Sequence, residues 1–415
     1  MQNVYLGRQP ILDIEGNLNS YEIMYSEGGE PEQGNSNRFL SASIINNVLN
    51  KFETSAILGD RRAFVKIDKK FLLHDLIFTI PNNFFIFSIV DIDIDEKIVN
   101  RFEELKKKGY ILSINNIVFN EENLKKYSAA LSAVSYVKMN FEEEIQNESM
   151  IKNIISTLKD NDIKVVATKV ESQEIYNLAK NLGCKLFQGY FFAKPKIFKN
   201  QKYDPTQAKV LKLYTLLIED TNIDEITTEF EQNHAITVQL LQYINSGAFH
   251  FRTKISSIHH ILTLVGRTPL AQWLMLMIYS KSVSTGTKVS PLMLMVKYRT
   301  ELMESIIKKV DPGVRSNTLG QAYFVGVLSL IDTVFGVELE KILNDMHVDI
   351  AIKEALLNDK GVLGDIYVVV RDIESFHIHG VSKFIEKYKL NKSFIDELAL
   401  NSMQKVITFE KALSY

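Results

Sequence analysis

The chain has 415 residues, 24% of them charged, and a formal net charge of -2. This balance gives no electrostatic reason to expect nucleic acid or an anionic membrane surface as a partner. The single cysteine, Cys184, excludes an intrachain disulfide and fits a reducing, cytoplasmic location. It adjoins an apolar run, so we expect a small core residue rather than a reactive thiol.

No membrane segment is predicted. Residues 1–10 lack a basic stretch followed by an apolar run, so a signal peptide is not expected. The most apolar helical pattern, residues 270–279, is well short of the roughly 20 residues that a membrane span needs. We therefore predict a cytoplasmic protein with neither a membrane nor a nucleic-acid partner.

Residues 1–200 alternate between short apolar runs and helical patterns. This order is typical of a parallel βαβ series, and a closed (β/α) TIM-like barrel is its economical arrangement. Strands are predicted over residues 4–12, 18–25, 63–67, 84–91, 110–114, 134–139 and 163–167, and in the apolar run 187–195. Helices are predicted over residues 39–52, 95–108, 121–131, 141–158 and 171–182.

The pattern changes after Pro195. Residues 196–206 are polar and rich in lysine, which indicates a linker between a barrel domain, residues 1–200, and an all-α domain, residues 207–415. Strand signals nearly vanish in the second part. Helices are predicted there over residues 207–218, 223–231, 235–245, 257–265, 269–281, 292–310, 319–334 and 337–343, with three or four more to residue 412.

Residues 165–195 organise the first half as a strand, a helix ended by Gly183, and a second strand. By pattern alone this is equally a purely structural unit. Two motifs add more: Ala167-Thr168-Lys169-Val170-Glu171 resembles Ala-Glu-x-Val-Glu, and the segment from Gln188 to Pro195, Gln-Gly-Tyr-Phe-Phe-Ala-Lys-Pro, resembles the closing motif of the same family. On these motifs, residues 1–200 resemble EAL-domain cyclic-di-GMP phosphodiesterases.

The resemblance implies a barrel that holds two divalent ions through carboxylates and one Asn at the strand ends. Such hard ions need several oxygen ligands, and together they clamp a phosphodiester under attack by water. Three of the family's site residues are kept: Glu22 in Glu22-Ile23-Met24, the lysine Lys138, and Gln188. The ligand-contacting Arg of the family appears as Ser26.

The remaining site positions of the family carry other residues: Lys66 for Asn, Ser88 for Glu, Asn115 and Asn116 for an Asp pair, and Thr168 for Glu. One carboxylate beside an added ammonium should not hold two divalent ions. We therefore predict an inactive barrel with no catalytic residue, no metal and no cofactor. The run Asp91–Asp95 is interpreted as a strand end and helix cap rather than a metal site.

Lys66 and Glu22 end successive inner strands of the predicted barrel. One hypothesis is that the Lys66 ammonium pairs with the Glu22 carboxylate where the family places a metal ion. The alternative is that Lys66 extends to solvent at the barrel mouth, where such a pair contributes under about 1 kcal/mol.

The second half resembles the HDOD domain, a helical relative of the HD phosphohydrolases. The resemblance is carried by residues 240–249, Leu-Leu-Gln-Tyr-Ile-Asn-Ser-Gly-Ala-Phe, with supporting matches at 255–258 and 264–266. Ser329 and Leu330 stand where the metal-binding His-Asp pair would be, so no metal site is predicted. Adjacent His259 and His260 point about 100° apart on a helix and are not expected to share an ion.

These observations lead to a non-catalytic regulatory adaptor in bacterial signal transduction. It would bind protein partners of unknown identity, with the contact surface on the helical domain, and a homodimer is left open. One alternative is a receptor that binds cyclic-di-GMP weakly, through Lys66, Lys138 and Gln188, without hydrolysis. The other is a divergent phosphodiesterase, for which the sequence offers no new metal ligands.

Overall fold

The structure is a computed structural model of the chain, and it describes residues 4–27, 57–90, 94–115, 127–141, 148–193, 205–219, 221–233, 236–238, 240, 244, 257–280, 289–345 and 348–413. The predicted helix 39–52 and the predicted linker 196–206 lie outside, or almost entirely outside, these ranges. So do parts of the predicted helices 121–131, 141–158 and 235–245.

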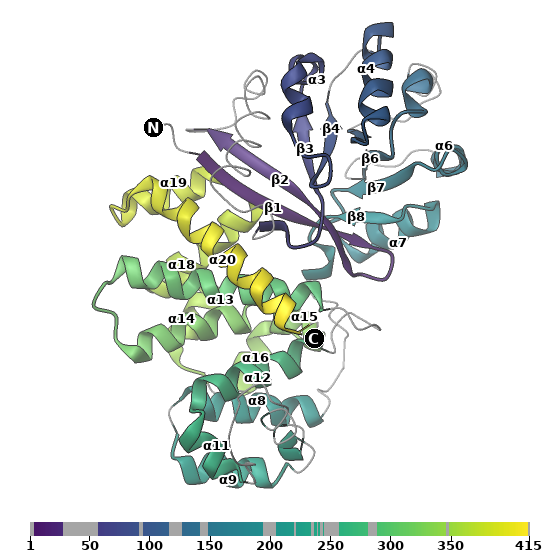
Figure 1. Cartoon of the computed structure of the whole chain (residues 1–415). Helices are drawn as coiled ribbons and strands as arrows, with labels where there is room; N and C mark the ends of the chain where they lie inside the picture. Colours follow the sequence, from purple (N-terminus) through teal and green to yellow (C-terminus); the bar gives the residue numbers. More distant parts are fainter. Residues whose placement is uncertain are drawn as a thin grey trace. The chain divides into compact units, whose positions relative to one another are not determined.

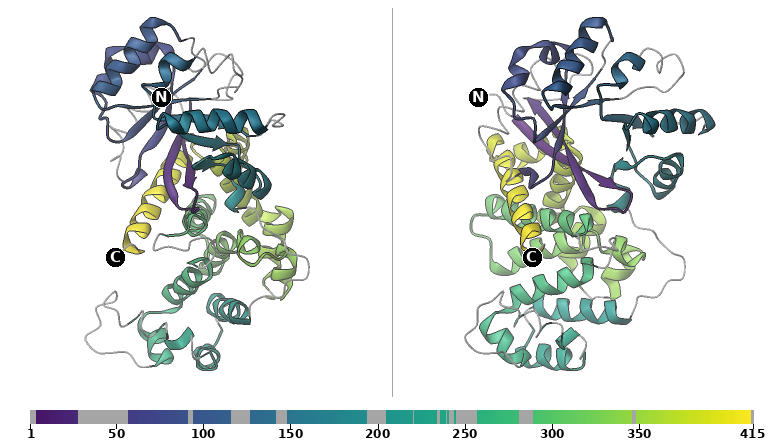
Figure 2. Two further views of the ribbon diagram at one scale, coloured as in Figure 1. Left: turned by 90° about the vertical axis from the view of Figure 1, so that its right-hand side faces the viewer. Right: turned by 45° about the vertical axis from the view of Figure 1, so that its right-hand side comes forward.

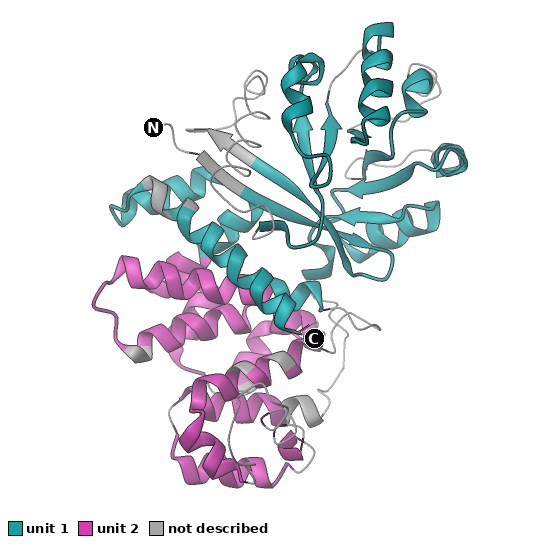
Figure 3. Ribbon diagram, viewed as in Figure 1, with its two compact units in different colours: residues 1–194, 284–294, 368–415 teal, residues 195–283, 295–367 magenta. Residues whose placement is uncertain are grey.

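The chain forms two compact units (Figure 3). Unit 1 combines residues 1–194, 284–294 and 368–415, and unit 2 combines residues 195–283 and 295–367. The division into domains 1–200 and 207–415 therefore stays a prediction. The C-terminal segment, residues 368–415, belongs to the same compact unit as the barrel.

Unit 1 contains the predicted barrel. Eight strands close in chain order: β1 (Val4–Asp13), β2 (Leu18–Glu27), β3 (Ala63–Ile67), β4 (Phe85–Ile89), β5 (Ile111–Ile114), β6 (Tyr136–Asn140), β7 (Lys164–Thr168) and β8 (Leu186–Gln188). The predicted barrel is confirmed, and β1 within it runs antiparallel to both β2 and β8. The other neighbouring pairs are parallel.

A tight turn explains the antiparallel strand. The Asp13 side chain accepts hydrogen bonds from the backbone N–H groups of Glu15 and Asn17, and Gly16 takes a φ of +81°. An Asp that binds its own backbone two residues on, followed by a glycine, reverses the chain within a few residues. β2 therefore returns directly beside β1, without the crossover helix that parallel neighbours need.

Helices on the outside of the barrel connect the strands (Figure 1). They include α3 (Lys69–Leu73), α4 (Glu96–Lys107), α6 (Glu148–Asp160) and α7 (Gln173–Leu182), with short 3-10 turns at Asp75–Thr79 and Phe191–Ala193. α7 shows how closely sequence sets the bounds. The Ser172 hydroxyl caps its start, and Gly183 ends it with a φ of +107°.

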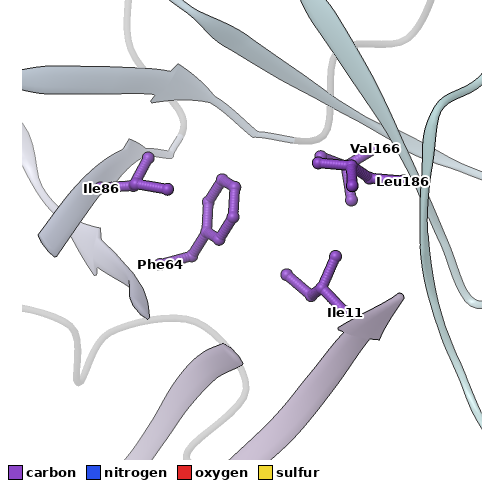
Figure 4. Close-up of a cluster of buried hydrophobic side chains, with 5 residues drawn as sticks. All are labelled: Ile11, Phe64, Ile86, Val166 and Leu186. Atoms are coloured by element: carbon purple, nitrogen blue, oxygen red, sulfur yellow. The ribbon is translucent and has the colours of Figure 1, made fainter. Parts of the chain in front are cut away.

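Alternating residues of the strands fill the barrel. Ile11, Phe64, Ile86, Val166 and Leu186 form a buried apolar cluster inside it (Figure 4). Side chains two residues further along a strand lie on the same face. The apolar cluster therefore lies below the cavity, and polar residues two positions away on the same strands line the mouth: Gln9 on β1, Lys66 on β3, Thr168 on β7 and Gln188 on β8.

The C-terminal segment contains the end of α18 (Gly361–Ser375), α19 (Ile378–Lys387) and α20 (Lys392–Leu413). α20 packs against β1. The yellow helix α20 lies beside the purple strands β1 and β2 in each view (Figures 1 and 2). The Arg61 guanidinium donates to both carboxylate oxygens of Glu410, at 2.8 and 2.7 Å. This bidentate pair joins the barrel to α20.

The described part of unit 2 contains helices and no strand, as predicted. They are α8 (Pro205–Ile218), α9 (Ile223–Glu231), α11 (Ile258–Leu264), α12 (Arg267–Ser280), most of α13 (Pro291–Val310), α14 (Ser316–Leu328), α15 (Ile331–Phe335), α16 (Leu339–Asp345), α17 (Ile350–Asn358) and the first part of α18. The single predicted helix 319–334 is two helices that break at Ser329-Leu330. Within the described ranges, no helix is both long and apolar enough to cross a membrane.

Candidate functional site

A cavity of about 480 Å³ opens at the mouth of the barrel. Six of the predicted site positions line it: Glu22, Lys66, Asn115, Lys138, Thr168 and Gln188. It therefore brings together residues that lie more than 160 positions apart in the sequence. The parallel strands β2, β3, β6 and β7 present these residues at their C-terminal ends, where TIM-type barrels carry their sites.

A buried ion pair lies in the wall of the cavity. The Lys138 Nζ atom is 3.0 Å from Glu22 Oε1, and the two side chains are 1% and 7% exposed. The same Nζ donates to Gln188 Oε1 at 3.1 Å and lies 4.6 Å from the centre of the Phe64 ring. The ammonium thus has a carboxylate, an amide oxygen and an aromatic face around it.

The environment favours the charged form of Glu22. Burial would raise the pKa of this carboxyl, but Lys138, Lys66 and Gln188 together lower it from 4.5 to about 2. Burial also lowers the pKa of Lys138, by more than the Glu22 carboxylate raises it. Keeping an ammonium here is therefore costly, and Glu22 supplies the compensating charge.

Gln188 fixes the other side of the carboxylate. Its Nε2 donates to Glu22 Oε2 and to Gln9 Oε1, the latter at 2.7 Å. An amide can bridge in this way because it carries both donors and an acceptor. Gln9, Glu22, Lys138 and Gln188 therefore form one hydrogen-bonded group that joins strands β1, β2, β6 and β8.

The predicted pairing of Lys66 with Glu22 is only partly seen. Lys66 Nζ lies 3.8 Å from Glu22 Oε1, at the outer limit of an ion pair, and its side chain is 55% exposed. The close, buried cation is Lys138. Lys66 accordingly matches the alternative in which its ammonium reaches solvent at the mouth.

The structure also locates three uncharged residues among the predicted site positions, Thr168, Ser88 and Asn115. Thr168 is buried and its hydroxyl donates to the Met139 carbonyl at 3.0 Å. Ser88 is fully buried, its hydroxyl has no hydrogen-bond partner among the described residues, and it does not line the cavity. Asn115 is buried and lines it. Asn116 and the side chain of Ser26 lie outside the described residues.

These residues do not fit a site for two divalent ions. Among the residues that the structure describes, no group of three or more His, Cys, Asp or Glu is placed to hold a metal ion. One Glu22 oxygen faces two ammonium groups and the other takes an amide N–H. Hard cations need several oxygen ligands, and a carboxylate already committed to lysines offers few.

Sequence reasoning missed six polar residues of the cavity: Gln9, Asn140, Lys169, Glu171, Tyr190 and Ser375. Gln9 lies on β1, where the antiparallel register sets it opposite Glu22. Lys169 and Glu171 directly follow Thr168 in a motif already singled out, so their position on the strand end could have marked them. Nothing in the sequence points to Ser375, because it comes from the C-terminal segment.

Lys169 has an unusual backbone. Its φ is +60°, in the left-handed region where a residue other than glycine is uncommon. Such conformations cost about 1 kcal/mol or more and cluster at ligand sites. With Lys66 and Lys138 it makes three lysines around the cavity against two acids, Glu22 and Glu171.

In unit 2, Ser329 is hydrogen-bonded to a guanidinium at the position where the resemblance sets a His-Asp pair. Ser329 caps the end of α14, where its hydroxyl donates to the Gly326 carbonyl at 2.8 Å. It accepts from Nη1 of the buried Arg299 at 3.0 Å. Leu330 is buried. A guanidinium at this point is a structural partner for the helix end and is incompatible with a bound cation beside it.

Two smaller predictions can be checked. Asp95 caps α4 by accepting from the Ile98 N–H, as interpreted, while residues 91–93 lie outside the described residues. Cys184 is a buried free thiol, as expected, and burial raises its pKa to about 12.

Family comparisons identify both the barrel and the helical part of the chain. Residues 66–195 match the model of the EAL domain and residues 205–336 match that of the HDOD domain. The chain therefore carries an EAL domain followed by an HDOD domain. Strands β1 and β2, with Gln9 and Glu22, precede the matched EAL segment yet complete its barrel.

Two relatives span nearly the whole chain. The uncharacterized protein YuxH of Bacillus subtilis is 25% identical over 379 residues, which are 90% of this chain and 91% of that protein. The cyclic di-GMP phosphodiesterase CdgJ of Vibrio cholerae is 22% identical over 389 residues, 92% of this chain and 88% of that protein.

Two solved structures are similar to a part of the chain. The PaMucR phosphodiesterase in complex with c-di-GMP is 15% identical with a TM-score of 0.39, covering 46% of this chain and 96% of that one. The FimX EAL domain from Pseudomonas aeruginosa, bound to c-di-GMP, is 17% identical with a TM-score of 0.38, covering 46% and 89%.

Proposed function

We propose that this protein acts in cyclic-di-GMP signalling without hydrolysing the dinucleotide, as a regulatory adaptor that binds other proteins. One observation carries the proposal: the buried Glu22–Lys138 ion pair, with Gln188 on the second carboxylate oxygen. The relative CdgJ is a cyclic di-GMP phosphodiesterase. A hydrolase is therefore the alternative that an experiment must exclude.

The electrostatics oppose metal-dependent hydrolysis. A divalent ion near Glu22 would lie close to two ammonium groups, one of them at 3.0 Å from the carboxylate. Like charges a few ångströms apart in a partly buried site repel by several kcal/mol. The positions that would need carboxylates to overcome this repulsion are Ser88 and Thr168, which carry only hydroxyls.

Hydrolysis is tested with purified full-length protein, cyclic-di-GMP and Mg²⁺ or Mn²⁺. We expect no linear or mononucleotide product from the wild type. Turnover that Glu22→Gln abolishes would overturn the proposal. A variant with Lys66→Asn, Ser88→Glu and Thr168→Glu moves the site toward the family's ligand set. Comparing metal binding by this variant and the wild type by calorimetry shows whether these positions are the defect.

The protein-binding role is tested by cross-linking the full-length chain to its partners, with mass spectrometry to locate the cross-links. We propose that they concentrate in the helical domain, residues 207–415. Cross-links confined to residues 1–200 would contradict this.

A second candidate is a receptor that binds cyclic-di-GMP in the barrel without hydrolysis. The cavity favours it: its volume of about 480 Å³ is in the range of small-molecule sites, and three lysines line it. Lys138 is committed to Glu22, so the exposed Lys66 and Lys169 are the residues that would meet phosphate oxygens.

Calorimetry with the dinucleotide, in EDTA and again in Mg²⁺, separates these functions. A receptor binds equally in both conditions. Lys66→Met and Lys169→Asn should each weaken binding about fivefold to tenfold, by loss of one charge-assisted contact. Asn is chosen at position 169 because it tolerates a positive φ. Lys185→Met, an exposed lysine away from the cavity, is the control.

A further inference from the structure

The rim of the cavity includes a turn from the far end of the chain. Ser375 lines the cavity and lies at the end of α18, just before α19. We call residues 374–376 the rim turn. It belongs to the C-terminal segment, which neither the EAL match at 66–195 nor the HDOD match at 205–336 covers.

The rim turn is bonded to the cavity wall. Tyr190, which also lines the cavity, donates its hydroxyl proton to the Glu374 carbonyl. Tyr190 follows Gln188 by two residues, and Gln188 holds the Glu22 carboxylate. A short run of chain at the end of β8 therefore contacts both the buried ion pair and the rim turn.

The third residue of the rim turn packs on β1. A Cβ atom added to Gly7 would lie 2.8 Å from the Phe376 ring, so only glycine leaves room for this contact. Phe376 has a φ of +59°. A bulky residue in the left-handed region is a strained conformation, which the surrounding structure must hold in place. The backbone N–H of His377 donates to the Asp372 carbonyl at 2.8 Å and closes the turn.

The rest of the segment is anchored away from the cavity. Arg61 binds Glu410 on α20 through two hydrogen bonds, and a Cβ on Gly59 would be 3.5 Å from Ile407. The segment is thus held on the barrel independently of the rim turn. A local opening of residues 374–376 does not require α20 to leave.

We propose that the rim turn forms one wall of the ligand site, and that binding of an anionic dinucleotide in the cavity is coupled to the seating of this turn. The inference rests on the receptor function proposed above. Bonds within the segment, such as the Ser375 hydroxyl to the Arg371 carbonyl at 2.8 Å, shape the turn, while the Tyr190 hydrogen bond and the Phe376 ring contact join it to the barrel. In the proposal, this strained turn has two states, seated on the barrel and released from it. A ligand that contacts Ser375 or Tyr190 favours the seated state, and by linkage the seated state favours the ligand.

Amide hydrogen exchange on the full-length chain tests the seating without ligand. Tyr190→Phe removes the donor, and Gly7→Ala places a methyl group against Phe376. Each should speed exchange at the amides of residues 376 and 377 by about tenfold, the effect of losing one net hydrogen bond. Tyr176→Phe is the matched control, because Tyr176 donates to the Ile14 carbonyl at 3.0 Å elsewhere on the barrel. Unchanged exchange in both variants would overturn the rim turn as a bistable element.

A cyclic-di-GMP titration in EDTA tests the coupling. The wild type should show slower exchange at residues 374–378 when the dinucleotide binds, and Tyr190→Phe and Gly7→Ala should bind about tenfold more weakly than Tyr176→Phe. Faster exchange in Tyr190→Phe with wild-type affinity would overturn the coupling and leave the receptor function standing. No binding by the wild type at all would overturn both.

Discussion

The buried ion pair of the barrel mouth makes a quantitative prediction about stability. Glu22→Gln removes the carboxylate charge and keeps its shape, and Lys138→Met removes the ammonium. Lys138 is 1% exposed, so the first change leaves a buried cation with amide oxygens alone. The second change leaves a buried carboxylate with Gln188 and the more distant Lys66.

Each single variant should destabilise unit 1 by about 3–5 kcal/mol, the usual cost of breaking a buried pair from one side. The double variant, with no charge left unpaired, should lie much closer to the wild type, giving a coupling energy of several kcal/mol. The lowered pKa supports the same scale, because a fall from 4.5 to about 2 corresponds to about 3 kcal/mol. A parallel cycle with Lys66→Met should give a coupling under about 1 kcal/mol, because Lys66 is 3.8 Å away and 55% exposed.

The free energies must be read from unit 1 alone. Opening free energies from hydrogen exchange at the amides of β2 and β6 provide this, while fluorescence of the single tryptophan, Trp273, follows unit 2 as an internal control. A coupling near zero between Glu22→Gln and Lys138→Met would refute the reasoning. So would an equally large coupling for Lys66→Met, because it would make Lys66 the buried partner.

Four further outcomes are expected. As pH falls from about 5 to 2, wild-type unit 1 should lose about 3 kcal/mol, because the folded state holds Glu22 ionised below the pKa of the unfolded chain; circular dichroism of Glu22→Gln should lack this loss. Arg61→Met should destabilise α20 by about 2 kcal/mol in hydrogen exchange, since the bidentate pair with Glu410 is largely buried, and unchanged exchange would contradict this. Gly189→Ala should prevent closure at β8, costing about 3 kcal/mol or more in urea unfolding, because φ is +153° and the new Cβ would lie 2.0 Å from the Val170 carbonyl oxygen. Cys184 should resist alkylation at pH 8 in the folded protein and react fully in denaturant; rapid labelling of the native chain would show it to be exposed.

Much of the barrel followed from local sequence signals. Apolar runs and the Gly183 stop predicted the strands and the end of α7 to within a few residues, because each signal depends on neighbouring residues only. The antiparallel direction of β1 follows from the Asp13–Asn17 turn, which reverses the chain without a crossover helix. The break at Ser329-Leu330 was missed because Arg299, which binds Ser329, comes from a different helix.

The residues of the site were likewise predictable where a sequence motif contains them, and not where they come from a distant part of the chain. The motifs predicted that Glu22, Lys138 and Gln188 belong to one site, and in the structure all three line the same cavity. They could not say which lysine would pair with Glu22, since β3 and β6 both end at the mouth and the choice depends on which ammonium is buried. Ser375 and the rim turn could not be found at all, because no sequence pattern links residue 375 to a strand end near residue 190.

The polar residues at the barrel mouth have one physical explanation. A carboxylate at the mouth cannot remain buried without a positive partner, and its neighbours Ser88 and Thr168 are uncharged, so burying Glu22 is costly unless a cation lies beside it. Lys138 serves in this role, at 3.0 Å, and Gln188 and Gln9 complete the shell across four strands. The mouth therefore keeps its shape and an open cavity while its positive charge is fixed in the protein. Two lysines that line this cavity stay exposed, Lys66 and Lys169, so an anion that entered it would meet their positive charge first.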